Sequence, residues 1–331
     1  MTLPLQLVQT LQNANPKDAW AAIFEHAWDL CSQSLAPGQA VAEVLKRDRS
    51  LADVDLFLAT AGWDLWSHFE EVVPRTSQEL AGWWNKHSPG RAILVLDALS
   101  MRETPWILHQ AEERGFVVHQ ARPTGAELPA DTTPFAKALG FGQRSALGNN
   151  GAGGSHAFPG ARTESVDIAW ADCAALIGSE PDWFFWHHWP DHRLHDHDDP
   201  GKGLQTLTEE VEEHLRGDAF WSLVERLATG RRLIITADHG YAASGQFIDS
   251  SAEQSDYLKG RYKSGRAIPG NDPTGAWVPP IDLAIESTHG RHLYVNGRRK
   301  WKSQGGYPTL THGGLSVLEV AVPFIEISRK K

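Results

Sequence analysis

The sequence has no run of about 18 or more apolar residues, which excludes a helix long enough to cross a membrane. Its first residues also lack the basic-then-apolar pattern of a secretion signal. Cysteine is scarce, because the 331 residues include only Cys31 and Cys173, far apart and among apolar neighbours. We therefore predict two buried free thiols rather than a disulfide, in a cytoplasmic protein with no membrane partner.

Positive charge is also in short supply. Lysine and arginine total 31 against 41 aspartates and glutamates, so the formal net charge is −10. This balance argues against general coating of nucleic acid, which needs a basic surface, although it leaves room for a local basic groove. The chain is long enough to bury a large core, and its 14 tryptophans are predicted to pack mainly there.

Three apolar runs, at 92–96, 183–186 and 233–236, are typical of strands buried on both faces of a sheet. Each is followed by acidic or histidine residues, which in chain order are Asp97, Asp191, His195, Asp238 and His239. Ligands bind at the carboxyl ends of the strands in open α/β sheets, so we expect these side chains to share one site.

From residue 90 onward, predicted strands alternate with helices: strand 92–97, helix 101–114, strand 116–121, and a last strand at 320–325. This alternation predicts an α/β fold with a mainly parallel sheet sandwiched by helices. Residues 1–88 are predicted to form an N-terminal helical region packed on this core, and 89–331 the catalytic domain. Within it, 241–290 is rich in Gly, Ser and Pro and is predicted to be a long insertion loop without periodicity.

Carboxylate and neutral imidazole are both good zinc ligands. For Asp238 and His239 alone, a histidine that caps a loop explains the pair equally well. The next candidate, His312, lies in a Thr-His-Gly-Gly stretch near the C-terminus. Since three strand ends supply carboxylates and three separate segments supply histidines, a two-metal site is the better hypothesis.

Two hydroxyl groups are candidate nucleophiles. Ser100 begins a Ser-Met-Arg-Glu stretch that fits a capping box, so we assign its hydroxyl to capping the next helix. Thr132, with Thr133 as second choice, lies at a predicted helix start in which Pro134 occupies the first turn. Amides of that turn could bind a phosphate oxygen. A plain helix-capping role for Thr132 explains the local sequence equally well.

Together these residues resemble the PglZ domain, a branch of the alkaline phosphatase superfamily, from about residue 92 to the C-terminus. The resemblance rests on five motifs in the order of the family, at 95–99, 128–132, 191–195, 236–240 and 312–323. It implies an alkaline phosphatase-like sheet. It also implies that Asp191, His195 and His312 hold one metal ion, that Asp97, Asp238 and His239 hold the second, and that Thr132 is the nucleophile.

The chain departs from this pattern at one position. PglZ domains commonly place an arginine directly after Asp-Ala-Leu, whereas this chain has Ser100 there and Arg102 two positions later. We carry the arginine's substrate contact over to Arg102. Sulfatase chemistry is not expected, since the Thr132 segment lacks the Cys/Ser-x-Pro-x-Arg context that it requires.

The resemblance implies two divalent metal ions, zinc first and manganese second, and hydrolysis of a phosphate ester. PglZ relatives in bacteriophage defence and in signalling favour a phosphodiester, such as a nucleotide or oligonucleotide, with defence-system proteins as partners. An aromatic-basic cluster in the insertion could clamp such a substrate, although an ordinary charged loop explains it as well; it comprises Tyr257, Lys259, Arg261, Tyr262 and Lys263. The alternative function is a non-catalytic structural or regulatory module of a defence complex.

Overall fold

The computed structural model describes residues 3–36, 38–87, 90–194, 203–243, 250–270, 272, 277–302 and 309–330. Its centre is a six-stranded sheet in the order β2-β11-β5-β1-β4-β3. Only β11 runs antiparallel to its neighbours, so the other five strands are parallel. The strands are β1 (Arg91–Leu96), β2 (Phe116–Gly125), β3 (Arg162–Val166), β4 (Asp182–His187), β5 (Arg232–Thr236) and β11 (Ala321–Arg329).

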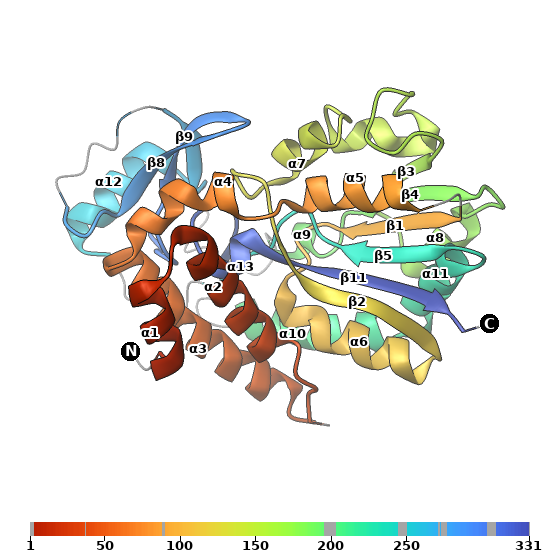
Figure 1. The fold of residues 1–331 in the computed structure, drawn as a ribbon, viewed down its shortest axis with the longest axis horizontal. Coiled ribbons are helices and arrows are strands. Elements are labelled where there is room, and N and C mark those ends of the chain that lie inside the picture. The colour runs from red at the N-terminus through yellow and green to blue at the C-terminus, as the bar shows by residue number, and fades with distance from the viewer. Residues whose placement is uncertain are drawn as a thin grey trace.

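Strand β1 shows why this sheet is buried on both faces. All six of its residues are buried, and alternate side chains enter different hydrophobic clusters. Ile93 and Val95 pack with α5 (Thr76–Lys86) and α7 (Thr132–Ala138), which lie above the sheet in Figure 1. The opposite cluster includes α6 (Thr104–Glu113), α10 (Gly203–Arg216) and α11 (Asp218–Ala228). The predicted α/β sheet sandwiched by helices is therefore confirmed.

The N-terminal region is helical, as predicted. It contains α1 (Leu5–Asn13), α2 (Pro16–Cys31), α3 (Ala40–Thr60), the 3₁₀ helix η1 (Trp63–His68), α4 (Phe69–Val72) and α5. The ring of Trp20 lies 4.7 Å from that of Trp66 and 4.9 Å from that of Phe69, measured between centroids. These rings belong to the same hydrophobic cluster as strand residues of the sheet, so the region and the sheet share a core.

The prediction of an unstructured insertion at 241–290 is wrong for its described part. It contains α12 (Ala252–Tyr262) and two strands of a three-stranded antiparallel sheet, whose third strand begins at residue 290; this sheet and α12 share a small core, at the upper left of Figure 1. The strands of that sheet are β7 (Ala267–Pro269), β8 (Asp282–Ser287) and β9 (Gly290–Val295). They are short and mix buried, half-buried and exposed residues, so their sequence shows no apolar run of the kind that marks β1.

Short elements complete the described fold; they are η2 (Met101–Glu103), η3 (Arg144–Asn150), α8 (Trp170–Cys173), η4 (Ala174–Leu176), α9 (Asp191–Leu194), β6 (Ala242–Ala243), β10 (Leu310–Thr311) and α13 (Val317–Val320).

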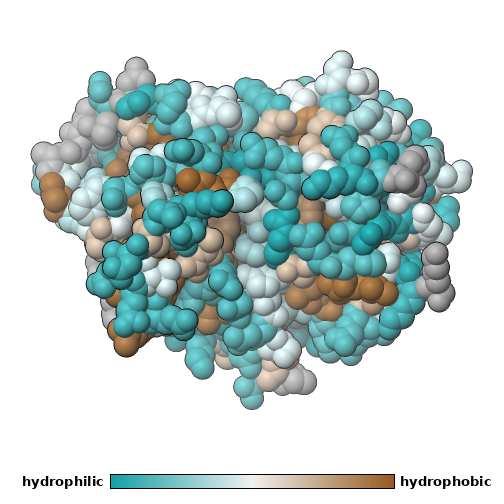
Figure 2. Space-filling model, in the orientation of Figure 1, coloured by the Kyte–Doolittle hydropathy of each residue, from teal (hydrophilic) through white to brown (hydrophobic). Residues whose placement is uncertain are grey.

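Cys31 and Cys173 are buried free thiols, as predicted. On the face drawn in Figure 2, hydrophobic residues form separate small patches among hydrophilic ones. Of the helices in the described segments, none has the length and apolar character needed to span a bilayer.

Candidate functional site

The residues predicted to bind metal meet at the carboxyl edge of the sheet. Asp97 follows β1, Asp238 and His239 follow β5, and α9 begins at Asp191. Two groups bring their ligand atoms within 4.8 Å of one another; they are Asp97 with Asp238 and His239, and Asp191 with His239 and His312. The first group has the composition predicted for one metal. The second group contains His239 in place of the predicted ligand His195, which lies outside the described residues.

A tight turn after β1 aims the Asp97 carboxylate into the site. Ala98 adopts the left-handed conformation with φ of 61°, which L side chains rarely adopt. Its backbone N–H donates to Oδ1 of Asp238 over 2.9 Å. The backbone N–H of Asp191 donates to the carbonyl oxygen of Asp97 over 3.1 Å. These bonds join the turns that follow β1, β4 and β5, so the carboxylates keep a fixed relation to one another.

Thr132 faces this cluster. Its Oγ1 donates to Oδ1 of Asp97 over 3.2 Å. Thr132 begins α7, and Asp131 is the capping residue, since its side chain accepts from the N–H of Thr133. The alternative that Thr132 serves only as a helix cap is therefore wrong. Thr133 is exposed and lines the neighbouring cavity.

Two residues absent from the prediction hold Asp97. The indole Nε1 of Trp186 donates to Oδ2 of Asp97 over 3.2 Å, and the Arg144 guanidinium forms an ion pair with the same oxygen. The sequence indicated Trp186 only as part of the apolar run that predicts a strand at 183–186. Arg144 begins η3 after a Gly-Phe-Gly-Gln loop, where no sequence signal marks it.

Arg102, which was predicted to contact the substrate, instead pairs with a buried carboxylate of the N-terminal helices. It is 3% exposed, and its guanidinium pairs with Asp48 of α3. Burial lowers its pKa, but the Asp48 carboxylate more than offsets this, so the pKa of Arg102 is raised overall. Ser100 caps η2, as expected, by accepting from the N–H of Arg102 over 3.3 Å. The arginine that reaches the site is therefore Arg144, so the assignment of Arg102 is corrected.

His239 and Asp238 are fully buried and lack protein partners that their chemistry requires. The Nδ1 of His239 donates to the carbonyl oxygen of Gly240 over 2.9 Å, which leaves Nε2 facing the carboxylates. This Nε2 lies 3.4 Å from Oδ2 of Asp238 and 3.6 Å from Oδ1 of Asp97. Within the described chain, neither Nε2 of His239 nor Oδ2 of Asp238 has a hydrogen-bond partner. Unpaired buried polar atoms are costly, so this donor set fits a divalent cation that would satisfy both.

Charge interactions shift the pKa values in this cluster. Burial lowers the pKa of His239, but the carboxylates of Asp238, Asp191 and Asp131 raise it more, so the net shift is upward. For Asp131, burial raises the pKa, and His312 and His239 more than offset this. The site is therefore dominated by negative charge that attracts cations.

His312 closes the cluster from the other side. Its Nε2 lies 3.4 Å from Oδ1 of Asp191, and its ring stacks on that of His239 with centroids 4.3 Å apart. Gly240, the residue after His239, packs closely against the backbone of Leu318, because a Cβ at position 240 would lie 2.2 Å from the carbonyl oxygen of Leu318. A side chain at this position would push the two histidine segments apart.

A cavity of about 560 Å³ adjoins the cluster and is bordered by Asp131, Thr133 and His312. Its far side includes Lys137 of α7 and the histidines of the β8–β9 hairpin, His289 and His292. Its lining residues do not include any member of the predicted aromatic-basic clamp. The residues that reach it from that segment are the next ones along the chain, 264–267.

The clamp itself lies on and just after α12. Tyr262 is 3% exposed and donates to Asp282, so its ring is not accessible to a substrate and cannot take part in the clamp. Tyr257 donates to the same carboxylate oxygen over 2.7 Å, and Arg261 donates to the carbonyl oxygen of Asp272. Lys259 and Lys263 are exposed.

No family model and no curated protein matches the sequence. Among solved structures, murine ectonucleotide pyrophosphatase/phosphodiesterase 5 aligns over 73% of this chain and 88% of its own, with 12% identity and a TM-score of 0.46. Its inactive form in complex with AMP aligns over 72% and 88%, also at 12% identity, with a TM-score of 0.45. Phosphonoacetate hydrolase from Sinorhizobium meliloti 1021, in complex with phosphonoacetate, aligns over 73% and 90%, with 14% identity and a TM-score of 0.37. At these TM-scores the likeness alone assigns neither a family nor an activity to the chain.

Proposed function

We propose that this protein is a metal-dependent phosphohydrolase that cleaves phosphodiesters with Thr132 as nucleophile. One observation carries the proposal: the Thr132 hydroxyl donates to Asp97, in a buried cluster where Asp238 and His239 have unsatisfied ligand atoms. A hydroxyl beside a cation site at the carboxyl edge of a parallel sheet is the arrangement that nucleophilic phosphoryl transfer requires.

The proposed ligands divide into two sets. Asp97, Asp238 and His239 would hold one divalent ion. Asp191 and His312, with His195 as predicted, would hold the other. Carboxylate and imidazole ligands suit zinc best and manganese next. When bound, such ions polarise the phosphoryl oxygens and stabilise the charge that develops on attacking and leaving oxygens.

Thr132 attacks phosphorus in the proposed reaction. Its oxygen bonds to phosphorus as its hydroxyl proton passes to Asp97 or to solvent, and the P–O bond to the first alcohol breaks, so that this alcohol leaves after taking a proton from water. The intermediate is a phosphate ester of Thr132 that still carries the second alcohol. Water then cleaves this ester, which releases the phosphate monoester of the second alcohol and restores the hydroxyl. Arg144 pairs with Asp97 beside Thr132 and is placed to contact a phosphate oxygen.

The cavity favours a diester over a monoester, because a diester has a second alcohol group that needs space. Lys137 and His292 are among its lining residues and offer donors for an anionic group. A nucleotide or oligonucleotide has these properties. Defence-system partners stay a prediction that follows from the sequence resemblance, and a cytoplasmic location stays a prediction from the scarce cysteines and the N-terminal sequence.

The test compares wild type with Thr132→Ala and Asp238→Ala. Bound metal is measured first, then hydrolysis of bis-p-nitrophenyl phosphate and p-nitrophenyl phosphate. We expect the wild type to bind metal and prefer the diester. Thr132→Ala should retain metal but lose activity by on the order of 10³-fold or more, and Asp238→Ala should lose activity together with the metal ion that Asp97, Asp238 and His239 would hold. Metal binding with no hydrolysis of either ester would favour the non-catalytic module, and full activity in Thr132→Ala would exclude this nucleophile.

A further inference from the structure

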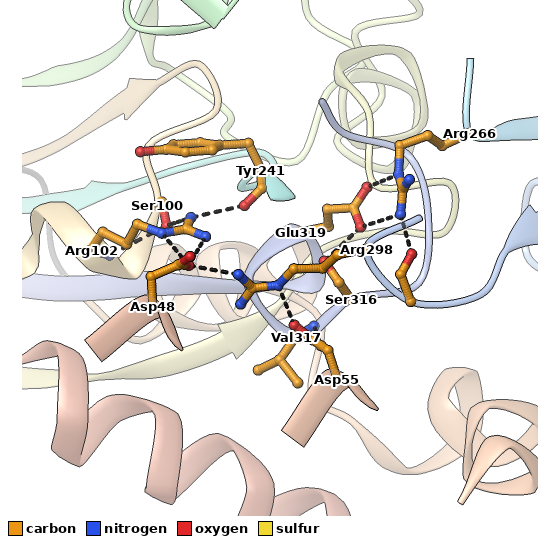
Figure 3. A network of polar contacts seen from close by, with 11 residues as sticks. Asp48, Asp55, Ser100, Arg102, Tyr241, Arg266, Arg298, Ser316, Val317 and Glu319 are labelled. Carbon is orange, nitrogen blue, oxygen red and sulfur yellow. Dashed lines mark hydrogen bonds and ion pairs between the residues drawn. The ribbon is translucent and has the colours of Figure 1, made fainter. Parts of the chain in front are cut away.

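Four buried charged side chains form a network between the N-terminal helices and the metal site (Figure 3). They are Asp48 and Asp55 of α3, Arg102 of η2, and Arg298 after β9, and the most exposed of them is 3% exposed. We call this set the α3 ion network. Asp48 and Asp55 are seven residues apart on one helix, which places both on the face that packs against the core. Two negative and two positive charges balance one another.

Arg102 connects Asp48 to the two metal-binding turns. Its Nη2 and Nε both donate to Oδ1 of Asp48, over 2.5 and 3.1 Å. Its Nη1 donates to the hydroxyl oxygen of Ser100 over 3.1 Å and to the carbonyl oxygen of Tyr241 over 2.9 Å. Ser100 lies three residues after Asp97, and Tyr241 lies two residues after His239. One guanidinium therefore fixes both turns relative to α3.

Arg298 connects the same carboxylate to the third ligand-bearing segment. It donates to Oδ1 of Asp48 over 2.7 Å and to Oδ2 of Asp55 over 2.5 Å. The other oxygen of Asp55 accepts from the N–H of Val317 over 2.7 Å, at the start of α13. This bond fixes the helix that follows the His312 loop.

Glu319, on α13, completes the connection to His312. Its carboxylate accepts from the N–H of Gly314 over 2.8 Å and from the hydroxyl of Ser316 over 2.6 Å. Arg266 neutralises it from the inserted segment, over 2.8 Å. The backbone on the C-terminal side of His312 is thus held to α13, and through Asp55 to α3 (Figure 3).

We infer that Asp48 and Asp55 are positioning residues that hold the segments bearing Asp97, Asp238, His239 and His312 in the relation that metal binding requires. This inference rests on the proposed metal site. Residues that orient metal ligands commonly affect metal affinity or activity by about 10–100-fold without touching the ion. The N-terminal helices are, on this account, part of the support of the active site and not only a cover for the sheet.

The α3 ion network depends on its balance of charge, so neutralising one member disturbs the others. Burial raises the pKa of Asp48, but Arg298 and Arg102 lower it more, so this group stays a carboxylate. Neutralising it leaves two buried guanidinium groups facing an uncharged amide. Arg102 then loses the partner that directs its fork towards Ser100 and Tyr241.

The test compares Asp48→Asn with a matched control, Asp182→Asn. Asp182 is also a buried carboxylate, 4% exposed, that pairs with an arginine, Arg91. Arg91 is the first residue of β1, whereas Asp97 follows the last residue of that strand, so this ion pair lies at the opposite end of β1 from the metal site. Zinc affinity is measured by competition with a chromogenic chelator, and kcat and KM with bis-p-nitrophenyl phosphate, at a temperature at which circular dichroism shows each variant folded. We expect Asp48→Asn to weaken zinc binding by about 10–100-fold and to lower kcat. Asp182→Asn should lower the melting temperature but bind zinc as wild type does.

Equal zinc affinity in Asp48→Asn and wild type would overturn the inference, as would an equal loss in Asp182→Asn. If Asp48→Asn does not fold, Arg102→Lys serves as the second variant, because it keeps the charge opposite Asp48 but cannot reach Ser100 and Tyr241 at once. It should weaken zinc binding, and unchanged affinity would again contradict the inference. Failure of wild type to bind either zinc or manganese would instead refute the proposed function.

Discussion

Arg102 and Arg144 illustrate at the scale of single residues how partners decide what a side chain does. Arg102 follows the Asp97 motif in sequence, yet its donors are engaged by Asp48, Ser100 and Tyr241. Arg144 is 47 residues from Asp97 in sequence, is 25% exposed, and pairs with that carboxylate. A guanidinium with open access beside the nucleophile can exchange its contact for a substrate phosphate, whereas a fully engaged one cannot.

We expect Arg144→Ala to raise KM for bis-p-nitrophenyl phosphate by about 10–100-fold, the value of one charge-assisted hydrogen bond. Arg144→Lys should restore part of this loss, because it keeps the charge but not the bidentate fork. Steady-state kinetics measure both, and metal content serves as the control, since Arg144 is not a proposed ligand. Unchanged KM together with loss of bound metal would show that Arg144 supports the metal site and not the substrate.

The meeting of these acidic and histidine side chains at one edge of the sheet could be predicted because its signal is local. Asp97, Asp238 and His239 directly follow buried apolar runs, and strand ends of a parallel sheet meet at one edge. Arg144 and Trp186 could not be predicted, since their contacts with Asp97 span 47 and 89 residues of sequence. Only the folded chain creates those contacts.

At the scale of elements, the junction of β4 and α8 shows a histidine placed for packing. His187, the last residue of β4, stacks on Trp170 of α8 with ring centroids 3.9 Å apart. Its Nε2 donates to the carbonyl oxygen of Ile168 over 2.9 Å, and its Nδ1 accepts from the N–H of Trp189 over 3.0 Å. Both ring nitrogens are thus used in the neutral form. Burial is the main cause that lowers the pKa of His187 to about 4.

This junction should make stability depend on pH. The unfolded chain takes up the His187 proton below about pH 6.5, whereas the folded chain does so only near pH 4. The neutral histidine therefore makes its full contribution to the free energy of unfolding above pH 6.5. This contribution, up to roughly 3 kcal/mol, is lost as the pH falls towards 4. Urea unfolding at pH 7.5 and 5 should show a smaller decrease for His187→Asn than for wild type. Equal decreases would mean that other groups cause the pH dependence.

Elements were predictable from sequence where burial on both faces imposes an apolar run, as in β1, β4 and β5. The three-stranded sheet formed by β7, β8 and β9 was missed because its short strands mix buried, half-buried and exposed residues. Its hydrophobic residues alternate imperfectly with polar ones in β8, and Pro269 ends β7. The fold of such a segment depends on long-range packing against residues such as Trp301, which local periodicity does not contain.

At the scale of the whole molecule, the proposed metal site couples ligand binding to folding. Its ligands come from four parts of the chain, near residues 97, 191, 238 and 312, and the α3 ion network links three of them, those near 97, 238 and 312, to α3. Metal that binds the folded chain but not the unfolded one stabilises the fold by mass action. Asp97, Asp238 and His239 are fully buried, so the metal would also satisfy atoms that otherwise remain unpaired.

Zinc should therefore raise the melting temperature of the chelator-treated wild type. At a free zinc concentration about 100 times Kd the gain is about 2.7 kcal/mol, which corresponds to a shift of several degrees. Asp238→Asn should keep the hydrogen bond from the N–H of Ala98 but show a clearly smaller shift, because it removes a charged ligand from one of the two proposed metal sets. Thermal unfolding followed by circular dichroism, with and without zinc, measures both. Equal shifts in the two proteins would place the stabilising zinc at another set of ligands, since only the wild type retains the complete buried cluster.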